Sequence, residues 1–218
     1  MAQFLCTHGS LQVDKTHAGI QSVIAKRKLR YQRAGAPVGD DLVERDFTAD
    51  SLDEKWLTDI TEHWTGEGKL YLCAIKDVCS RRIVGYAIDQ RMKASLAVRA
   101  LENALQQRGY PEGVIVHSDR GSQFRSRRFQ QALKRHKLLG SMGRVGACGD
   151  NAAMESFFSL VQKNVLDRQP WRTRQELRLA IVSWIEGKYH RKRRQCRLGK
   201  LTPVEFEAIM MDAVGLAA

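Results

Sequence analysis

The sequence predicts an α/β domain in which helices cover the faces of a mixed sheet, and two observations predict it. First, two apolar strand patterns, at residues 70–78 and 81–89, are joined by the short connection Cys79-Ser80, which is typical of a hairpin. Second, strand and helix patterns alternate after this hairpin, which is typical of βαβ units. A hairpin followed by βαβ units implies a sheet with both antiparallel and parallel strands.

Each element has its own signal along the chain. A short β-prone run at 56–61 precedes the hairpin, and apolar runs predict strands at 113–119 and 138–142. Apolar residues recur at helical spacing over 93–108, where Gly109 is placed to end the helix. Further helices are predicted at 20–32, at 127–137, from Asp150 or Asn151 to about 165, at 174–189, and as a last short helix capped by Thr202.

The composition is that of a folded protein without a membrane anchor. Of 218 residues, 43% are hydrophobic and 28% charged, which excludes a disordered chain. Five scattered cysteines contain no C-x-x-C pair and are expected to be small buried thiols. No apolar stretch approaches membrane length and the start has no signal-peptide pattern, so we expect a cytoplasmic protein with no membrane partner.

Basic residues are concentrated in three acid-free runs, at 26–33, 120–137 and 188–200, and the net charge is +12. A single basic run is more often a solvated helix face than a binding site. Three runs in one short chain favour a nucleic-acid partner, because lysine and arginine release counterions from phosphates. None of the runs has the clean apolar face that membrane-surface binding needs.

Three carboxylates occupy unusual places in this pattern. Asp59 lies inside the first strand, Asp119 ends the strand at 113–119, and Glu155 lies one turn inside a helix, at the margin of its buried stripe. Converging carboxylates repel unless cations neutralise them, and hard oxygen ligands suit Mg²⁺ or Mn²⁺. Two such ions can support phosphodiester displacement. An aspartate at a strand end is more often a turn or helix cap, so the residues alone leave both interpretations open.

Several segments carry a family resemblance. They are WLTDIT, YLCAIKDVCSRRIVGY, VIVHSDRGSQF, SMGRVGACGDNAAMESFF and LTPVEFE, in this order, between about Asp46 and Glu207. They resemble the catalytic domain of bacterial insertion-sequence transposases encoded by two overlapping reading frames, which are relatives of the retroviral integrases. That family has two aspartates and a glutamate, with 35 residues between the last two. The same number of residues separates Asp119 from Glu155.

The resemblance implies a ribonuclease H-like fold: a five-stranded mixed sheet flanked by helices, with its first three strands antiparallel and additional C-terminal helices. The catalytic domain is then expected at 46–210, including the basic run 188–200. Residues 1–45 are expected to be an N-terminal basic segment, a remnant or a linker. Because they offer one basic helix at most, the module that recognises the element ends is expected to be absent or reduced.

The resemblance also implies a chemistry. Asp59, Asp119 and Glu155 match the metal-ligand and catalytic positions, which would hold two Mg²⁺ or Mn²⁺ ions. The activity would be DNA cleavage at the element ends followed by strand transfer into a target. The implied partners are the DNA of both sites, further copies of the chain assembled on DNA, and a companion reading-frame product with a helix-turn-helix.

Other residues have expected supporting roles. His117 is expected to line the pocket or to pack within its strand, and Asn151 to hold Glu155 or to cap its helix. Contact with DNA is expected for Arg120, Ser122, Gln123, Lys163, Arg191, Arg193 and Arg194. Two alternatives to a transposase stay open: a non-catalytic DNA-binding remnant, and a ribonuclease H-like nuclease that hydrolyses without transferring.

Overall fold

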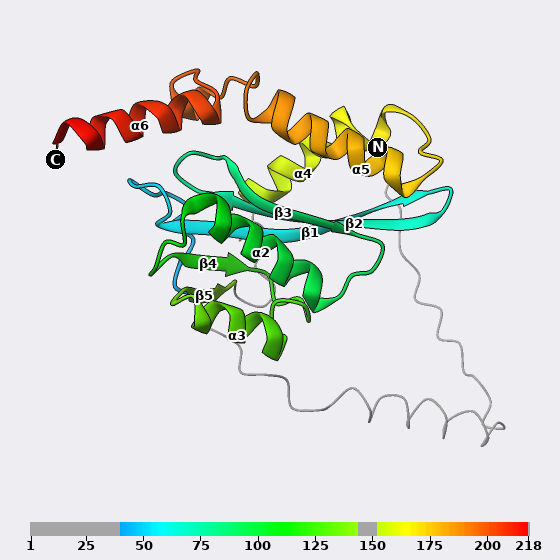
Figure 1. Cartoon of the computed structure of the whole chain (residues 1–218), viewed down its shortest axis with the longest axis horizontal. Helices are drawn as coiled ribbons and strands as arrows, with labels where there is room; N and C mark the ends of the chain where they lie inside the picture. Colours follow the sequence, from blue (N-terminus) through cyan, green and yellow to red (C-terminus); the bar gives the residue numbers. More distant parts are fainter. Residues whose placement is uncertain (1–39, 144–151, 218) are drawn as a thin grey trace, which may run out of the picture. The chain divides into compact units, whose positions relative to one another are not determined.

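The computed structural model describes residues 40–143 and 152–217 (Figure 1). The predicted helix at 20–32 and the predicted cap residue Asn151 lie outside the described residues. Residues 36–218 cluster into one compact unit.

The described strands form one five-stranded mixed sheet in the order β3-β2-β1-β4-β5. The first three strands are antiparallel neighbours, and β4 and β5 add in parallel beside β1, as the sequence predicted. The predicted run at 56–61 belongs to a longer strand, because it pairs with β2 along its whole length. The strands are β1 (Lys55–Thr65), β2 (Gly68–Asp77), β3 (Ile83–Asp89), β4 (Ile115–Ser118) and β5 (Leu139–Met142).

Helices cover both faces of the sheet (Figure 1). One core lies between the sheet and α2 and α3, and the other lies between the sheet, α4, α5 and η2. Gly85 of β3 lets α2 approach closely, since a Cβ atom there would lie 2.5 Å from the carbonyl oxygen of Ala100. The helical elements are α2 (Ala94–Arg108), α3 (Arg127–Arg135), α4 (Ala152–Asn164), η1 (Leu166–Arg168), α5 (Arg174–Ser183), η2 (Trp184–Tyr189), η3 (Cys196–Leu198) and α6 (Pro203–Ala217).

The helix ends follow the predicted signals. Gly109 ends α2 with φ of 72°, in the left-handed region that glycine tolerates. Thr202 caps α6: its hydroxyl accepts the Glu205 N–H at 3.2 Å, and the Glu205 carboxylate accepts the Thr202 N–H at 2.9 Å. Because α6 runs to Ala217, it is longer than the short helix that was predicted.

The predicted helix at 174–189 is not uniform. Its last six residues form a π-helix, in which the His190 N–H donates to the Ile185 carbonyl at 3.0 Å. The side chains of Trp184, Ile185 and Tyr189 are all buried there. Helical periodicity predicted Trp184 and Ile185 on the apolar face, whereas the burial of Tyr189 in the π-helix was not predicted.

Two simpler expectations can be compared with the described residues. No helix among residues 40–143 and 152–217 is long and apolar enough to cross a membrane. Cys73 is buried, as predicted, and Cys79 is half-buried. The same prediction is wrong for Cys196, which is exposed because it starts the short surface turn η3.

Candidate active site

Asp59 and Asp119 lie where the pairing of two parallel strands stops. The last paired residues of β1 and β4 are Thr58 and Ser118, so each aspartate is the next residue along its strand. Neighbouring strands are about 4.8 Å apart, and residues in register point to the same face. The topology therefore brings together two carboxylates that are 60 residues apart in the sequence.

The face to which Asp59 points is the one that α4 covers. Leu57, two residues earlier in β1, packs in the same core as Met154 and Phe157 of α4. Side chains alternate along a strand, so Asp59 shares this face with Leu57. Glu155 stands in the first turn of α4, beside these buried residues but itself exposed. Glu155 was predicted to lie at the edge of the buried helix face, and in the structure its side chain is exposed to solvent.

The three carboxylates interact electrostatically. Burial, and to a lesser extent the negative charges of Asp119 and Glu155, raise the pKa of Asp59 to about 6. A hydrogen bond from the Ile60 N–H to Asp59 Oδ1, at 2.7 Å, opposes this rise. Such coupling is what a group of converging carboxylates produces before a cation neutralises it.

The donor chemistry fits a hard divalent cation, whereas the side-chain positions do not form a closed site. The carboxylate oxygens of half-buried Asp59 and of exposed Asp119 and Glu155 are suitable ligands for Mg²⁺ or Mn²⁺. Among the described residues, however, no group of three or more His, Cys, Asp or Glu side chains is arranged to hold a metal ion. A closed site would require these side chains to rearrange, and Glu155 is exposed, so its carboxylate is not held by the core.

Asp119 is held by its own loop. The Gly121 N–H donates to Asp119 Oδ1 at 2.9 Å, which orients an otherwise exposed carboxylate. A Cβ atom on residue 121 would lie only 2.8 Å from the same oxygen and 3.1 Å from Gln123 Oε1. A side chain at this position would therefore displace the Asp119 carboxylate from the orientation that it has here.

The structure describes one of the two predicted supporting residues, His117, but not the other, Asn151. His117 is buried, with Nδ1 2.9 Å from Ser141 Oγ and its ring edge-on to Phe47. This is the packed strand histidine that the sequence left open, on the same strand face as Asp119. Asn151 lies outside the described residues, so its role stays a prediction.

Comparison with known proteins gives a consistent family. Two models of the integrase core domain match residues 50–148 and 136–203. Transposase InsF for insertion sequence IS3A, from Escherichia coli K12, is 42% identical over 177 residues, which are 81% of this chain and 62% of that protein. A 31 kDa protein of insertion element IS600, from Shigella sonnei, is 38% identical over 83% of this chain and 68% of its own length.

The chain belongs to the integrase core family, on the branch of insertion-sequence transposases. This integrase core spans about 62% of the length of the InsF relatives that it matches.

Solved structures show the same fold. The HTLV-2 integrase catalytic core domain in complex with magnesium superposes with a TM-score of 0.56 at 17% identity, over 73% of this chain and 99% of that one. The catalytic core domain of BIV integrase superposes with a TM-score of 0.53 at 20% identity, over 74% of this chain and 97% of that one. The predicted ribonuclease H-like fold is therefore confirmed.

The loop after β4 of the integrase core carries three of the predicted DNA contacts. Arg120 is partly buried, and its Nε donates to the Gly143 carbonyl at 2.7 Å. Ser122 is exposed, whereas Gln123 makes a long hydrogen bond, 3.5 Å, to the Met92 carbonyl. Contact of all three residues with DNA stays a prediction.

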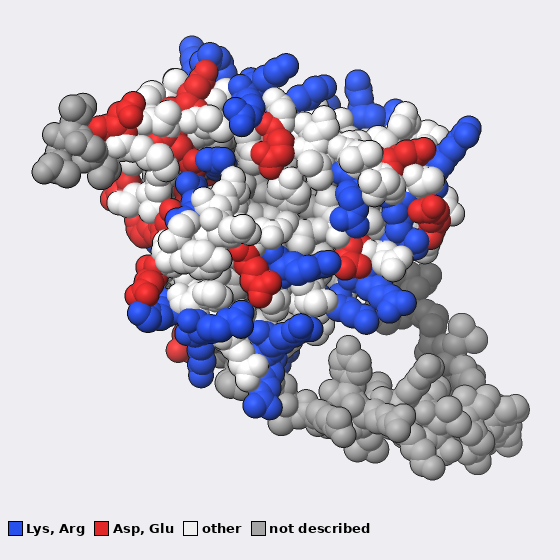
Figure 2. All heavy atoms as spheres, in the orientation of Figure 1, with Lys and Arg blue, Asp and Glu red and all other residues white. Residues whose placement is uncertain are grey.

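The remaining predicted contacts lie on the surface of the C-terminal half. Lys163, Arg191, Arg193 and Arg194 are all exposed. Arg194 is engaged within the chain, since its guanidinium donates to the Lys200 carbonyl and lies 3.2 Å from Glu205. Figure 2 shows Lys and Arg side chains over the C-terminal helices at the top and around α3 at the bottom, with fewer between them.

Sequence reasoning missed Lys76 of β2. This lysine is 2% exposed and lies in the core strand, where its Nζ donates to the Ala153 carbonyl of α4 at 3.0 Å. The signal was present, because a lysine inside the apolar run LYLCAIKDV contradicts the pattern of a buried strand. Its partners could not be read from the sequence, since Ala153 is 77 residues away.

Gly121→Ala should lower activity without unfolding the integrase core. The added methyl group displaces the Asp119 carboxylate, and a misplacement of this kind lowers turnover by about 10- to 100-fold. The loop is at the surface, so the midpoint of thermal unfolding should change little. Gly187→Ala is the matched control, because nothing lies within 4 Å of a Cβ atom there. Equal activity of the two variants would contradict the orienting role.

Proposed function

We propose that this chain is the catalytic domain of a DNA transposase, a divalent-metal-dependent polynucleotidyl transferase. Its reaction is cleavage of a phosphodiester at the end of a mobile element and joining of the exposed 3′-hydroxyl to target DNA. The observation that carries the proposal is that the negative charges of Asp119 and Glu155 act on half-buried Asp59 within a chain of the integrase core family. InsF of IS3, a relative at 42% identity, is a transposase by name.

The carboxylates have distinct roles in this proposal. Asp59 is the half-buried ligand on the central strand, and Asp119 is the ligand oriented by the Gly121 N–H. Glu155 approaches from α4 and completes the set when its side chain turns toward the aspartates. All three must be ionised to bind the ions, and the raised pKa of Asp59 opposes ionisation of this residue until a cation is present.

The divalent ions would supply Lewis-acid stabilisation of the attacking and leaving oxygens in phosphodiester displacement. Asp59, Asp119 and Glu155 would hold these ions beside the DNA phosphate. The attacking hydroxyl forms the new P–O bond as the 3′-oxygen of the cleaved bond leaves. No covalent protein–DNA bond is needed, so no serine or tyrosine nucleophile is required. The HTLV-2 core of the same fold was solved in complex with magnesium, which supports this cofactor.

The partners follow from the same family. We propose that the chain acts on the element ends and on target DNA, as an oligomer of identical copies assembled on DNA. The HTLV-2 core was solved in dimeric and trimeric forms. End recognition is assigned to the product of a companion reading frame with a helix-turn-helix. Exposed Lys163, Arg191 and Arg193 are proposed to contact the DNA backbone.

Asp119→Asn should separate chemistry from binding. Mn²⁺-dependent cleavage and joining of a labelled oligonucleotide should fall below detection, because the substitution removes a charged ligand of the ions. Retention of the same oligonucleotide in a gel-shift assay should change less than about twofold, because phosphate contacts by basic side chains remain. Denaturing gels of the products measure the first quantity.

Three outcomes are informative here. Loss of cleavage with retained binding supports a catalytic Asp119. Equal loss of cleavage and binding contradicts it. Cleavage without any joined product, in the wild-type protein supplied with element ends, would favour the ribonuclease H-like nuclease over the transposase.

A further inference from the structure

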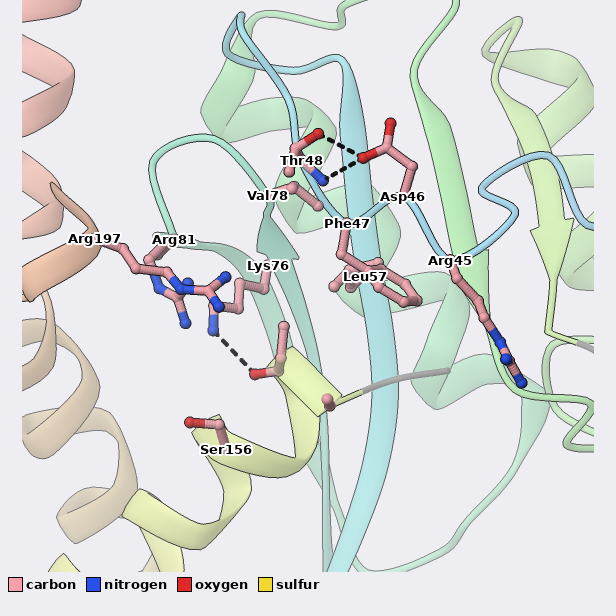
Figure 3. A pocket seen from close by; sticks show the side chains of 12 residues that line it. Arg45, Asp46, Phe47, Thr48, Leu57, Lys76, Val78, Arg81, Ser156 and Arg197 are labelled. Atoms are coloured by element: carbon pink, nitrogen blue, oxygen red, sulfur yellow. Dashed lines mark hydrogen bonds between the residues drawn. The ribbon is translucent and has the colours of Figure 1, made fainter. Parts of the chain in front are cut away.

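A cavity opens on the sheet face that α4 covers, and the three carboxylates do not line it. Its volume is about 510 Å³. Lys76, Arg81 and Arg197 line one side of it, and Phe47 and Leu57 line the other, with Arg45 beyond Phe47 (Figure 3). None of these residues belongs to the carboxylate group or to the DNA contacts predicted from the sequence.

Lys76 is the most unusual group in this cavity. It is a buried cation, and among the described residues no ion pair joins it to a carboxylate; its Nζ donates to the Ala153 carbonyl. Burial, and to a lesser extent the positive charges of Arg81 and Arg197, lower the pKa of Lys76 to about 7. Burying an uncompensated charge is unfavourable, so an anion in the cavity would supply the charge that Lys76 lacks.

Arg81 is held in place beside Lys76. Its Nε donates to Gln195 Oε1 at 2.8 Å, and its carbonyl accepts the Tyr189 hydroxyl at 2.9 Å. Its backbone has φ of 59°, in the left-handed region that arginine rarely adopts. The turn after β2 therefore holds Arg81 in an unfavourable backbone conformation. A role of its guanidinium in binding would explain this conformation.

The acidic side chain at the rim does not neutralise these cations. Asp46 lines the cavity, but its carboxylate lies 2.8 Å from Lys55 Nζ and also accepts the Thr48 hydroxyl. These hydrogen bonds, that of Lys55 first, lower the pKa of Asp46 to about 2. The charge of Asp46 is thus committed to Lys55, and the side of the cavity near Lys76 stays positive.

The opposite wall suits an apolar ring. Phe47 and Leu57 lie together across the cavity from the two arginines (Figure 3). A cavity with cations at one side and an aromatic ring at the other matches a nucleotide, whose phosphate and base need these two surroundings. Ser156, exposed at the rim on α4, adds a hydroxyl donor.

The cavity is also close to the proposed chemistry. Leu57 precedes Asp59 by two residues on the same strand face, a rise of about 6.6 Å. Ser156 directly follows Glu155 on α4. A group bound here would therefore neighbour the phosphodiester at the carboxylates.

We propose that this cavity binds one unpaired nucleotide next to the reacting phosphodiester of DNA, with its phosphate at Lys76, Arg81 and Arg197 and its base against Phe47. The inference rests on the proposed function, because it takes the ligand to be the DNA on which the carboxylates act. The base must leave the duplex stack to enter, which is easiest at a frayed or single-stranded end.

Lys76→Met tests the phosphate side. Methionine fills a similar volume without charge, so the variant should unfold at the same temperature as the wild-type protein or higher. Its affinity for a fluorescein-labelled single-stranded oligonucleotide of about 12 nucleotides should fall about tenfold in fluorescence anisotropy without metal. Lys69→Met is the matched control on the same strand, since Lys69 pairs with Glu62 away from the cavity, and it should change affinity less than about twofold.

Phe47→Leu tests the base side. It keeps an apolar side chain and removes the ring, so affinity for the single strand should fall about fivefold or more. Displacement of the oligonucleotide by inorganic phosphate should be weakened by Lys76→Met and unchanged by Phe47→Leu. Both substitutions should reduce the affinity for a blunt duplex of the same sequence by less than they reduce the affinity for the single strand, because the duplex bases stay stacked.

The outcomes separate this inference from the proposed function. Equal affinity of Lys76→Met and Lys69→Met overturns the phosphate site, and unchanged affinity of Phe47→Leu overturns the nucleotide in favour of a simple anion. If Lys76→Met does not fold, Arg197→Gln takes its place. Arg197 is exposed, and this substitution should weaken binding to a similar extent. If the wild-type protein cleaves DNA, Asp119→Asn abolishes this cleavage and Lys76→Met binds normally, only the nucleotide site in the cavity is rejected. If Lys76→Met weakens binding but the wild-type protein does not cleave DNA, only the proposed function is rejected.

Discussion

Asp59→Asn should abolish metal-dependent cleavage and, at the same time, make the metal-free protein more stable at neutral pH. Activity should fall more than about a hundredfold, because a charged ligand of the ions is lost and such ions supply several kcal/mol of stabilisation. Stability should rise because the residue is half-buried and repelled by Asp119 and Glu155. Asparagine has no charge to bury.

The pH dependence gives the sign of this effect. The pKa of Asp59 is raised from 3.8 to about 6, so the folded protein binds this proton more tightly than the unfolded chain. The corresponding stabilisation is fully present below a pH of about 4 and is lost as the pH rises through about 6. The ionised carboxylate then destabilises the fold by at most about 3 kcal/mol, and by less because it is partly exposed.

Thermal unfolding at several pH values checks this prediction. At pH near 8 the Asp59→Asn variant should unfold several degrees above the wild-type protein, and near pH 4 the two midpoints should converge. Added Mn²⁺ should raise the midpoint of the wild-type protein and leave that of the variant nearly unchanged. Asp50→Asn, an exposed aspartate before β1, is the control and should show neither effect. A variant that is less stable than the wild-type protein at pH 8 would contradict the repulsion.

Glu207→Gln should cause a large loss of stability, about 3 to 5 kcal/mol. Glu207 of α6 is buried and pairs with Arg82, at 2.5 Å, and with Arg108 at the end of α2. Arg108 Nε also lies 3.2 Å from Asp53. Although burial opposes ionisation, hydrogen bonds from Arg108 and Arg82 keep the pKa of Glu207 below its ordinary value. Glutamine would leave two guanidinium groups without their shared negative charge.

Urea unfolding at neutral pH measures this loss. Glu205→Gln is the matched control, because it lies two residues earlier on the same helix, is more exposed and retains a side-chain oxygen for the helix cap. It should lower the free energy of unfolding by less than about 1 kcal/mol. A similarly small change for Glu207→Gln would show that the buried pairs do not anchor α6.

The order of elements could be predicted because it depends on local signals. Period-two and apolar runs located the strands, and Gly109 and Thr202 ended or opened their helices as predicted. The π-helix at Trp184–Tyr189 was not predicted, because its wider turn depends on three side chains packing against α4 and the sheet. Local periodicity does not contain that information.

The candidate site also contains residues that the sequence could predict and residues that it could not. Asp59, Asp119 and Glu155 stood out because carboxylates interrupted apolar patterns at family spacing. Lys76 interrupted a strand equally clearly, but a single buried lysine has no motif. Its neighbours Ala153, Arg81 and Arg197 come from three separate parts of the chain. Buried charge is interpretable only with its surroundings.

The sheet and its flanking helices could be inferred from the amino-acid sequence, because backbone propensity and side-chain alternation are encoded within short windows. The sequence also singled out the three acidic residues as candidates. Which charges are neutralised, in contrast, became known only from the folded structure. Glu207 meets Arg82 across 125 residues of chain, whereas Lys76 meets further cations and a carbonyl oxygen. The free energy of a charge depends on its burial and on the neighbouring charges, and these are fixed only when distant segments pack together.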